Sequence, residues 1–279
     1  ITGVNSILGV NICNYFIKKN HSVTGIYNNN TNNLKLISNK CKLVKLNLLR
    51  FDRVKLPNKI DLVIHIAAIT DENNKNLLKV NYQGSKKLYD YSLSTNAKLF
   101  IFFSSISIEL DKHNLNKKKY LISKKKAEKY FQKKRGTKVV SLRIPAILSP
   151  QLNKNLWIYK ILKKIISNQK VRIYNETSYT NHFIYYRDII KLINKLSITK
   201  NLKIYDEINL CSRGKIRILN LINILKKITK SNSSIKYIKS KNINNLINSK
   251  KLENTYFFKP LNCKTSIEKF LLEKKNIIN

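Results

Sequence analysis

Apolar residues in the first half of the chain follow two patterns that predict alternating helices and strands. Val10, Ile12 and Phe16 recur at helical spacing, which predicts a helix that ends near residue 20. Continuous apolar runs such as 98–105 are typical of parallel strands buried on both faces of a sheet. Alternating strands and helices predict an α/β fold with a doubly wound parallel sheet. The other strands are predicted at 21–27, 42–48, 61–68 and 138–143, and the other helices at 80–93 and 120–133.

The pattern loosens after Pro145 and Pro150 into helices and short strands. This change indicates a boundary near residue 150. We predict a main α/β domain over residues 1–150 and a smaller mixed α/β lobe over 151–279, part of which returns to the sheet. The helices of the second region are predicted at 157–167, 187–196 and 218–229, and one strand at 170–174.

The length of the chain, 279 residues, is sufficient to bury a full core. The sequence begins with Ile1 and contains no Met, so we expect an initiator and a leading β-strand to precede it. No apolar stretch approaches the roughly 20 residues that span a bilayer. The first residues do not resemble a signal peptide. We therefore expect a cytoplasmic protein with no membrane partner.

The cysteines are far apart in the sequence. Cys13, Cys41, Cys211 and Cys263 show no C-x-x-C spacing and have no histidine at ligand spacing. The pattern indicates neither a zinc site nor a redox pair. We expect free thiols and no bound metal.

The formal net charge is +40, from 55 Lys and Arg against 15 Asp and Glu. A charge of this size is typical of proteins that bind nucleic acids. Here the lysines are scattered along the whole chain and accompany a heavy use of Asn and Ile. We interpret the charge as compositional drift, so nucleic acid is not an expected partner, although an anionic substrate would be attracted.

Gly3 and Gly9 mark a strand–turn–helix segment at the start of the chain. Glycine permits a tight turn and a close approach of the backbone to a ligand. The N–H groups and dipole of the following helix N-terminus, at Ile7 and Leu8, favour a bound pyrophosphate. Ser6 occupies the middle glycine position of a G-x-x-G-x-x-G pattern. Together with the alternating elements, the segment predicts a Rossmann-type dinucleotide site.

The end of the next strand carries Tyr27 and Asn28. Sites for NAD normally place an Asp or Glu there, which binds the ribose hydroxyls of the adenosine. A site without that carboxylate does not repel a 2′-phosphate. The cofactor is therefore expected to be NAD or NADP, with neither favoured.

Tyr120 and Lys124 are four residues apart on a predicted helix and therefore project from one face. An ammonium close to a phenol stabilises the phenolate, which lowers the pKa of the tyrosine from about 10 and makes it a usable acid or base. Ser105 ends the preceding strand, at the edge of a parallel sheet where ligands bind. We predict a catalytic site formed by Ser105, Tyr120 and Lys124.

With these motifs the sequence resembles the extended short-chain dehydrogenase/reductase family, the NAD-dependent epimerases and dehydratases that act on nucleotide sugars. The resemblance covers most of the chain, and several ordered motifs are more specific than any one of them. The matching segments are 2–9, 61–68, 80–84, 100–105, 120–124, 142–150 and 183–188.

The resemblance implies roles for individual residues. Tyr120 would exchange a proton with a sugar hydroxyl or keto oxygen, Ser105 would hydrogen-bond the same oxygen, and Lys124 would hold the nicotinamide ribose. A nucleotide sugar would bind to the smaller lobe, and a homodimer is the assembly often found in the family. The residues expected at the cofactor are Gly3, Ser6, Ile7, Leu8, Gly9, Tyr27, Asn28, Asn47, Leu48, Ala67, Ala68, Asn81, Lys124 and Pro145, and those expected at the substrate are Ser105, Tyr120, Arg172 and Asn181.

Several positions depart from the family pattern, among them Glu109 and Leu110, which replace the Tyr-Gly that commonly follows the catalytic strand. Asn47 replaces the usual Asp at the adenine, Ser6 replaces a glycine, and Asn181 stands where many members place an Arg that contacts the diphosphate. Altered affinity for the cofactor or the diphosphate is expected. Arg143, Arg172 and Arg187 are candidates to supply the missing charge, and each is equally well explained as a surface charge.

The residues after Ser105 reduce the number of reaction types that the resemblance allows. Sugar 4,6-dehydratases of this family place an Asp-Glu pair there, whereas this chain has Ile106 and Ser107. Dehydration is therefore disfavoured. Epimerisation at C4 and reduction of a 4-keto sugar, both reactions of surface-polysaccharide pathways, remain. The alternative is a non-catalytic dinucleotide-binding regulator or a nucleic-acid-binding member of the same fold, and the presence of all three catalytic residues argues against it.

Overall fold

The chain divides into two units, and each is described here by itself. The computed structural model describes residues 1–51, 54–111, 116–150, 156–238 and 246–278. Unit 1 comprises residues 1–143 and 190–208, and unit 2 comprises residues 144–189 and 209–279.

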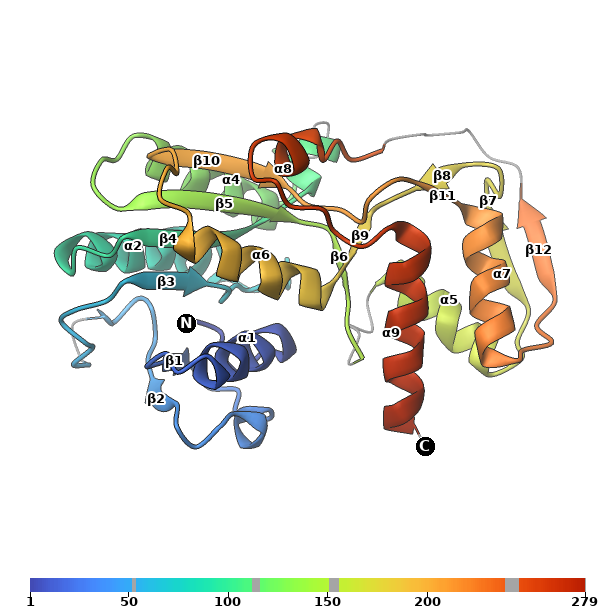
Figure 1. Cartoon of the computed structure of the whole chain (residues 1–279), viewed down its shortest axis with the longest axis horizontal. Helices are drawn as coiled ribbons and strands as arrows, with labels where there is room; N and C mark the ends of the chain where they lie inside the picture. The colour runs from blue at the N-terminus through green and yellow to red at the C-terminus, as the bar shows by residue number, and fades with distance from the viewer. Residues whose placement is uncertain (52–53, 112–115, 151–155, 239–245, 279) are drawn as a thin grey trace. The chain divides into compact units, whose positions relative to one another are not determined.

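Unit 1 contains a parallel sheet with helices on both faces (Figure 1). The helices α2 and α4 lie behind the strands in the view of Figure 1, and α6 lies in front of them. The predicted α/β fold with a doubly wound parallel sheet is confirmed. In chain order the elements are α1 (Ile7–Lys18), β1 (Thr24–Tyr27), the 3-10 helix η1 (Leu34–Leu36), β2 (Lys42–Lys45), β3 (Leu62–His65), the π-helix η3 (Lys79–Gly84), α2 (Ser85–Ser94), β4 (Leu99–Ser105), α3 (Ser107–Leu110), α4 (Lys119–Gln132), β5 (Lys138–Ile144), α6 (Tyr186–Ile198) and β10 (Tyr205–Asn209).

The strand pairing brings the ends of several strands to one edge of the sheet. β1 pairs with β2 and β3 with β4, both in parallel, and the order continues through β5 to β10. Thr2 forms parallel bridges to Ile26 of β1 and to His65 of β3, and so joins the two sets. The carboxyl ends of β3 and β4 and the turn after Thr2 therefore lie at the same edge, where ligands bind in sheets of this kind.

Aromatic side chains fix α2 and α4 against the sheet. Phe100 and Phe102 of β4 are fully buried. The Phe102 ring lies 5.1 Å from that of Phe131 in α4, and the Phe100 ring lies 5.4 Å from that of Tyr89 in α2, both measured between centroids. Burial of one such side chain stabilises the fold by about 2 kcal/mol. This packing holds the helix that carries Tyr120 and Lys124 in a fixed place beside β4.

The observed strands are shorter than the predicted ones. β1 begins at Thr24 rather than at His21, and β3 ends at His65, so that Ala67 and Ala68 lie in the loop beyond it. Apolar runs predict burial rather than strand pairing: Leu46 and Leu48 are buried beyond the end of β2, and Ala67 and Ala68 are half-buried beyond the end of β3. The helix predicted at 80–93 begins as a π-helix, a type of turn that is often found at functional sites.

Residues 190–208 belong to unit 1, although they follow the boundary predicted near residue 150. The reason is that β10 extends the sheet beside β5. The backbone N–H of Val139 donates to the carbonyl of Ile204 at 2.8 Å, and Lys138 Nζ donates to the carbonyl of Lys200 at 2.9 Å.

Unit 2 is a mixed α/β unit in which α7 packs against α5 and α9. Parallel pairs form between β6 and β9 and between β7 and β12. Most of its short strands were not predicted, because strands of two to four residues are too short to show a periodicity. The helices α8 and α9 were not predicted either. The elements are β6 (Ala146–Leu148), α5 (Trp157–Ile166), β7 (Val171–Tyr174), β8 (Tyr179–Thr180), β9 (Phe183–Tyr185), β11 (Ile216–Arg217), α7 (Ile218–Thr229), β12 (Ile235–Ile238), α8 (Lys250–Asn254) and α9 (Cys263–Ile278).

Candidate active site

The N-terminus of α4 is capped from a distant loop. The N-cap residue Lys118 has no capping side chain, and the backbone N–H of Tyr120 donates to Glu72 Oε1 at 3.2 Å. A carboxylate at this end of a helix also interacts favourably with the helix dipole. Glu72 therefore helps to fix the start of the helix at Tyr120.

Lys124 lies in the interior of unit 1, with only 1% of the residue exposed. Its Nζ donates to the carbonyl of Phe103 at 2.6 Å and lies 4.6 Å from the centroid of the Phe102 ring. Burial lowers the pKa of Lys124 to about 7, and the carboxylate of Glu128 opposes that shift. The charge of this lysine is therefore sensitive to its neighbours near neutral pH.

The phenol of Tyr120 is not activated by Lys124 in this arrangement. Lys124 Nζ lies over the Tyr120 ring, 5.6 Å from its centroid, and its hydrogen bond goes to the carbonyl of Phe103. Burial raises the pKa of Tyr120 to about 12. The prediction that Lys124 brings this pKa toward neutrality is therefore wrong for this structure, because desolvation of the phenolate outweighs an ammonium placed over the ring.

Ser105 ends β4 at the edge where the other site residues gather. The residue is buried, and its Oγ accepts a hydrogen bond of 3.3 Å from the backbone N–H of Ser107. Lys124 bonds the carbonyl of Phe103, two residues before Ser105, so the lysine and the serine share one strand end. The neighbouring Ser104 Oγ is buried and has no hydrogen-bond partner in the part of the chain that the structure describes.

Asn81 connects the π-helix η3 to two parts of the site. Its Oδ1 accepts from the N–H of Ile69 at 2.7 Å, and its Nδ2 donates to the carbonyl of Ile69 at 2.8 Å and to Ser123 Oγ at 3.3 Å. Ile69 follows the loop that contains Ala67 and Ala68, and Ser123 precedes Lys124. Asn81 thus holds the loop after β3 beside α4.

In the turn between Gly3 and Gly9, both glycines lie very close to other backbone atoms. Gly3 has a φ of +69°, and a Cβ on it would lie 2.8 Å from the backbone N of Ala67. A Cβ on Gly9 would lie 2.4 Å from the carbonyl oxygen of Gly3. Only glycine fits at these two positions.

Ser6, at the position of the missing glycine, has an ordinary backbone and a structural use for its side chain. It is the N-cap of α1 with a φ of −73°. Its Oγ donates to the carbonyl of Gly3 at 2.8 Å and accepts from the N–H of Gly9 at 3.0 Å. The first N–H groups of a helix lack intrahelical acceptors, so Ile7 and Leu8 present theirs at the turn.

His65 is a satisfied core residue rather than a catalyst, and its hydrogen bonds fix its tautomer. Ser85 Oγ donates to the carbonyl of Asn81 at 2.6 Å, so it accepts from His65 Nε2 at 2.7 Å. Nδ1 therefore accepts from Thr2 Oγ1 at 2.6 Å. Burial holds the pKa of His65 well below its usual value, and the ring is neutral.

The residues predicted at the adenosine differ in exposure. Asn28 and Asn47 are exposed, and Tyr27 is half-buried. Asn47 Oδ1 accepts from the N–H of Leu49 at 3.0 Å. Leu48 is buried, and a Cβ on Gly84 would lie 2.9 Å from its Cβ.

Three predicted residues lie in unit 2. Pro145 is buried between β5 and β6, and Arg172 is exposed on β7. The Asn181 amide binds one backbone segment, because Nδ2 donates to the carbonyl of Ile247 and Oδ1 accepts from its N–H, both at 2.9 Å. Arg187, one candidate for the missing charge, forms an ion pair of 2.8 Å with Glu273.

Two acidic residues of the site were missed in the sequence. Glu72 reaches α4 from 48 positions away, and no local pattern indicates such a contact. Glu128 follows Lys124 by one helical turn, so its spacing from Tyr120 and Lys124 was a usable signal. The carboxylate of Glu128 is clamped by Arg143, with 2.9 Å between Oε2 and Nη2.

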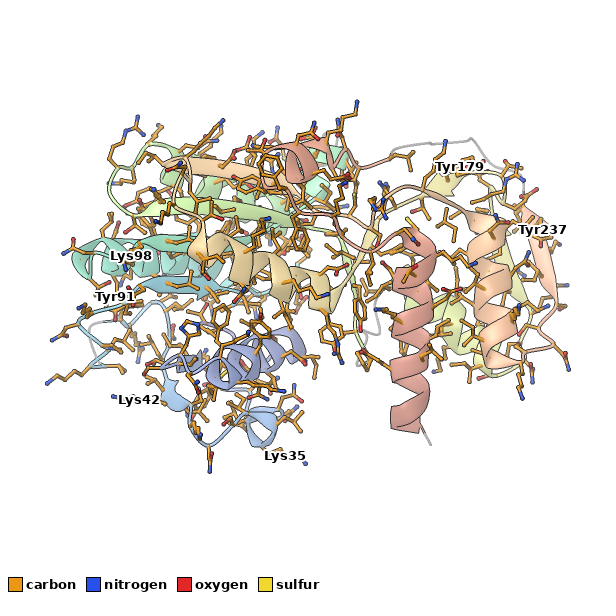
Figure 2. The ribbon with its side chains drawn as sticks, in the orientation of Figure 1. Lys35, Lys42, Tyr91, Lys98, Tyr179 and Tyr237 are labelled. Carbon is orange, nitrogen blue, oxygen red and sulfur yellow. The ribbon has the colours of Figure 1, made fainter. Side chains whose placement is uncertain are left out.

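Other features of unit 1 lie away from these residues. A cavity of about 490 Å³ is lined by Val23, Leu62 and Tyr91 among others and by none of the predicted site residues. Lys35, Lys42 and Lys98 are exposed and come from three separate segments (Figure 2). Over the described ranges, no group of three His, Cys, Asp or Glu side chains could hold a metal, and no helix is long and apolar enough to span a membrane.

A glycine turn leads into α1, and a tyrosine–lysine pair lies on α4, with the lysine hydrogen-bonded to β4 near its carboxyl end. These features are typical of a short-chain dehydrogenase/reductase type of α/β protein. The sequence model of the NAD dependent epimerase/dehydratase family matches residues 1–211. The chain belongs to this family, which confirms the resemblance drawn from its motifs.

The comparisons give distant relatives over nearly the whole chain. The chain is 21% identical over 257 residues to the uncharacterized UDP-glucose epimerase YtcB of Bacillus subtilis (strain 168), with 82% of this chain and 81% of that protein covered. Among solved structures, the UDP-N-acetylglucosamine 4-epimerase of Methanobrevibacter ruminantium M1 in complex with UDP-N-acetylmuramic acid is 22% identical, with a TM-score of 0.80 and coverage of 99% and 96%. The Bordetella bronchiseptica enzyme WbmG in complex with NAD and UDP is 17% identical, with a TM-score of 0.81 and coverage of 99% and 94%.

Proposed function

We propose that this chain is an NAD(P)-dependent enzyme that epimerises a nucleotide sugar at C4. The observation that carries the proposal is the placement of Tyr120 and buried Lys124 on one face of α4. Lys124 Nζ donates a hydrogen bond to the carbonyl of Phe103, near the carboxyl end of β4. The epimerase names of the relatives support it.

In this proposal the side chains act on the sugar oxygen. Tyr120 moves a proton to or from the C4 oxygen, and Ser105 Oγ hydrogen-bonds the same oxygen. Burial raises the pKa of Tyr120 to about 12, so the phenol is protonated at neutral pH and can donate to an oxyanion at C4. Accepting a proton from the C4 hydroxyl requires the phenolate, which a positive charge close to its oxygen would favour. Asn81 keeps the loop after β3 in place beside the helix.

The fit of a dinucleotide rests on the cradle around α1. Gly3 and Gly9 allow backbone approaches that a Cβ would block. The N–H groups of Ile7 and Leu8 at the helix N-terminus would bind the pyrophosphate. Lys124 would bind the ribose of the nicotinamide. When bound, the nicotinamide supplies a hydride acceptor and donor for C4 of the sugar.

Neither NAD nor NADP is favoured by the residues at the adenosine end. Tyr27 and Asn28 provide no carboxylate that would repel a 2′-phosphate. Both forms therefore belong in the test. The substrate contacts predicted for Arg172 and Asn181 and the homodimer stay predictions.

The test combines cofactor binding with product analysis. NADH and NADPH are titrated by fluorescence, and the wild type is then incubated with UDP- and dTDP-hexoses and with their 4-keto derivatives. We expect the C4 epimer to form without net consumption of the cofactor.

The other outcomes separate the alternatives. Stoichiometric consumption of NADH with a 4-keto sugar would identify a reductase instead. Cofactor binding without turnover of any substrate would favour a non-catalytic regulator. Absence of binding by both cofactors, or a DNA complex that persists at physiological salt, would reject the enzyme proposal.

A further inference from the structure

A buried acidic residue lies one turn beyond Lys124 on α4. Tyr120, Lys124 and Glu128 are spaced by four residues, so they share one face of the helix. The Glu128 side chain is only 4% exposed. Nothing in the proton transfer proposed above uses it.

Three hydrogen bonds from β5 fix the Glu128 carboxylate. Arg143 donates from Nε to Oε1 at 3.2 Å and from Nη2 to Oε2 at 2.9 Å. Ser141 Oγ donates to Oε1 at 2.8 Å. Such a bidentate pair fixes the orientation of the carboxylate as well as its position.

Fold stability alone is a weak reason for this arrangement. Replacing a buried ion pair by well-packed apolar residues is often neutral or stabilising, because both charges lose their hydration. A role for the charge itself is therefore worth seeking, and Lys124, one turn earlier on the same helix face, is also buried.

The carbonyl of Phe103 and the face of the Phe102 ring favour the ammonium of Lys124, but neither carries a full negative charge. Around Lys124, its own helix contributes Tyr120 and Glu128, β3 contributes the neutral ring of His65, and β4 contributes the carbonyl of Phe103. Glu128 provides the negative charge that favours the ammonium. Around Glu128 the titratable and charged groups are Lys124 on α4, Arg143 on β5, Glu109 on α3, and Tyr205 and Glu207 on β10.

We propose that Glu128 is a positioning residue whose carboxylate, oriented by Arg143 and Ser141, keeps Lys124 in its charged form for binding the dinucleotide ribose. The inference rests on the proposed function, since it gives Lys124 the cofactor role described above. Glu128 acts through Lys124 and touches neither sugar nor cofactor.

The experiment measures the dissociation constant of NADH between about pH 5.5 and about 9.5, a range that includes the pKa of Lys124, about 7, and the lower value expected in Glu128→Gln. The wild type is compared with Glu128→Gln, Arg143→Gln and Lys124→Met. Glu128→Gln and Arg143→Gln break the same ion pair but remove charges of opposite sign, so they form a matched pair. Thermal unfolding followed by circular dichroism checks that each variant is folded.

We expect NADH affinity of the wild type to fall on the alkaline side as Lys124 loses its proton. Glu128→Gln removes a negative neighbour and lowers the pKa of Lys124, so the fall moves to lower pH by about one unit, or about tenfold weaker binding at a pH above both values. Arg143→Gln removes a positive neighbour, so the fall moves to higher pH. Lys124→Met shows weak binding and no such fall.

If the Glu128–Arg143 pair had a purely structural role, the pH at which NADH affinity falls would shift in the same direction in both variants. That result would overturn the inference. An unchanged profile in Glu128→Gln would do the same. If Glu128→Gln does not fold, a downward shift in Arg143→Gln alone contradicts the inference. Failure of the wild type to bind NADH or NADPH would instead reject the proposed function, so the two failures are distinguishable.

Discussion

The glycine turn before α1 and the Tyr120 face of α4 lie at the same edge of one sheet, yet they are built by different means. The turn is made of backbone: Gly3 and Gly9 are required because a Cβ would lie 2.8 Å from the N of Ala67 or 2.4 Å from the O of Gly3. The α4 face is made of side chains whose charges are controlled by burial.

The comparison explains which departure from the family pattern is tolerated. Ser6 replaces a glycine without strain, because its φ of −73° is ordinary and its Oγ bridges Gly3 and Gly9. Gly3 and Gly9 do not tolerate such a replacement, because a Cβ at either position would collide with backbone atoms. A glycine pattern therefore contains positions with unequal physical demands, and only some of them need glycine.

The largest change in stability is expected from Gly9→Ala. In an open helix this substitution would stabilise by about 1 kcal/mol. Here the new methyl group meets backbone atoms that cannot move aside, so we expect a loss of about 3 kcal/mol and a loss of NADH binding. Urea denaturation and a fluorescence titration measure the two effects.

Gly214→Ala is a control for a methyl group added to a glycine in open space. Gly214 has a φ of +72°, but no atom lies within 4 Å of the added Cβ. The expected cost is only that of the left-handed backbone, about 1 kcal/mol. Equal losses in the two variants would mean that close approach in the turn is not what makes Gly9 necessary.

Lys124→Met is expected to stabilise the protein by about 2 kcal/mol while it weakens NADH binding, because a buried ammonium is replaced by an apolar chain. The folded pKa of Lys124, about 7, lies below its usual value of 10.5. The cost of burying its charge is therefore fully present below pH 7 and declines as the pH rises toward 10.5. The stability difference between variant and wild type should shrink accordingly from pH 7 to 9.5 in urea titrations. A variant less stable than the wild type at pH 7 would show that Lys124 stabilises the fold rather than destabilising it.

The smallest effects are expected at Ser6. Ser6→Ala removes the cap of α1 and should cost about 1 kcal/mol, whereas Ser6→Gly should cost only a few tenths of a kcal/mol. NADH affinity should change little in either variant, because the N–H groups of Ile7 and Leu8 remain. Loss of NADH binding in Ser6→Gly, measured by the same fluorescence titration, would show that the hydroxyl contacts the cofactor directly.

The sequence was informative where a signal is local. The apolar run at 98–105 and the four-residue spacing of Tyr120 and Lys124 predicted β4 and the face of α4. Long-range contacts gave no such signal, as with Glu72 at the start of α4 and Asn181 on the backbone of Ile247.

The pKa values of the site residues could not be predicted from the sequence either. Spacing alone predicted a phenol with a lowered pKa, whereas burial raises the pKa of Tyr120 to about 12 and the hydrogen bond of Lys124 Nζ goes to the carbonyl of Phe103. Glu128 was partly predictable from the sequence. Its spacing was visible, but its burial and its clamp by Arg143 depend on how β5 lies against α4.

The most direct test of the account is the turnover of Tyr120→Phe on the nucleotide sugar that the wild type epimerises. The substitution removes only the hydroxyl, so NADH affinity and the thermal midpoint should stay close to the wild-type values. We predict that kcat falls by about 10³-fold, within the range for loss of a general acid–base. A kcat within tenfold of the wild type, with NADH binding intact, would contradict the central claim that Tyr120 carries the proton.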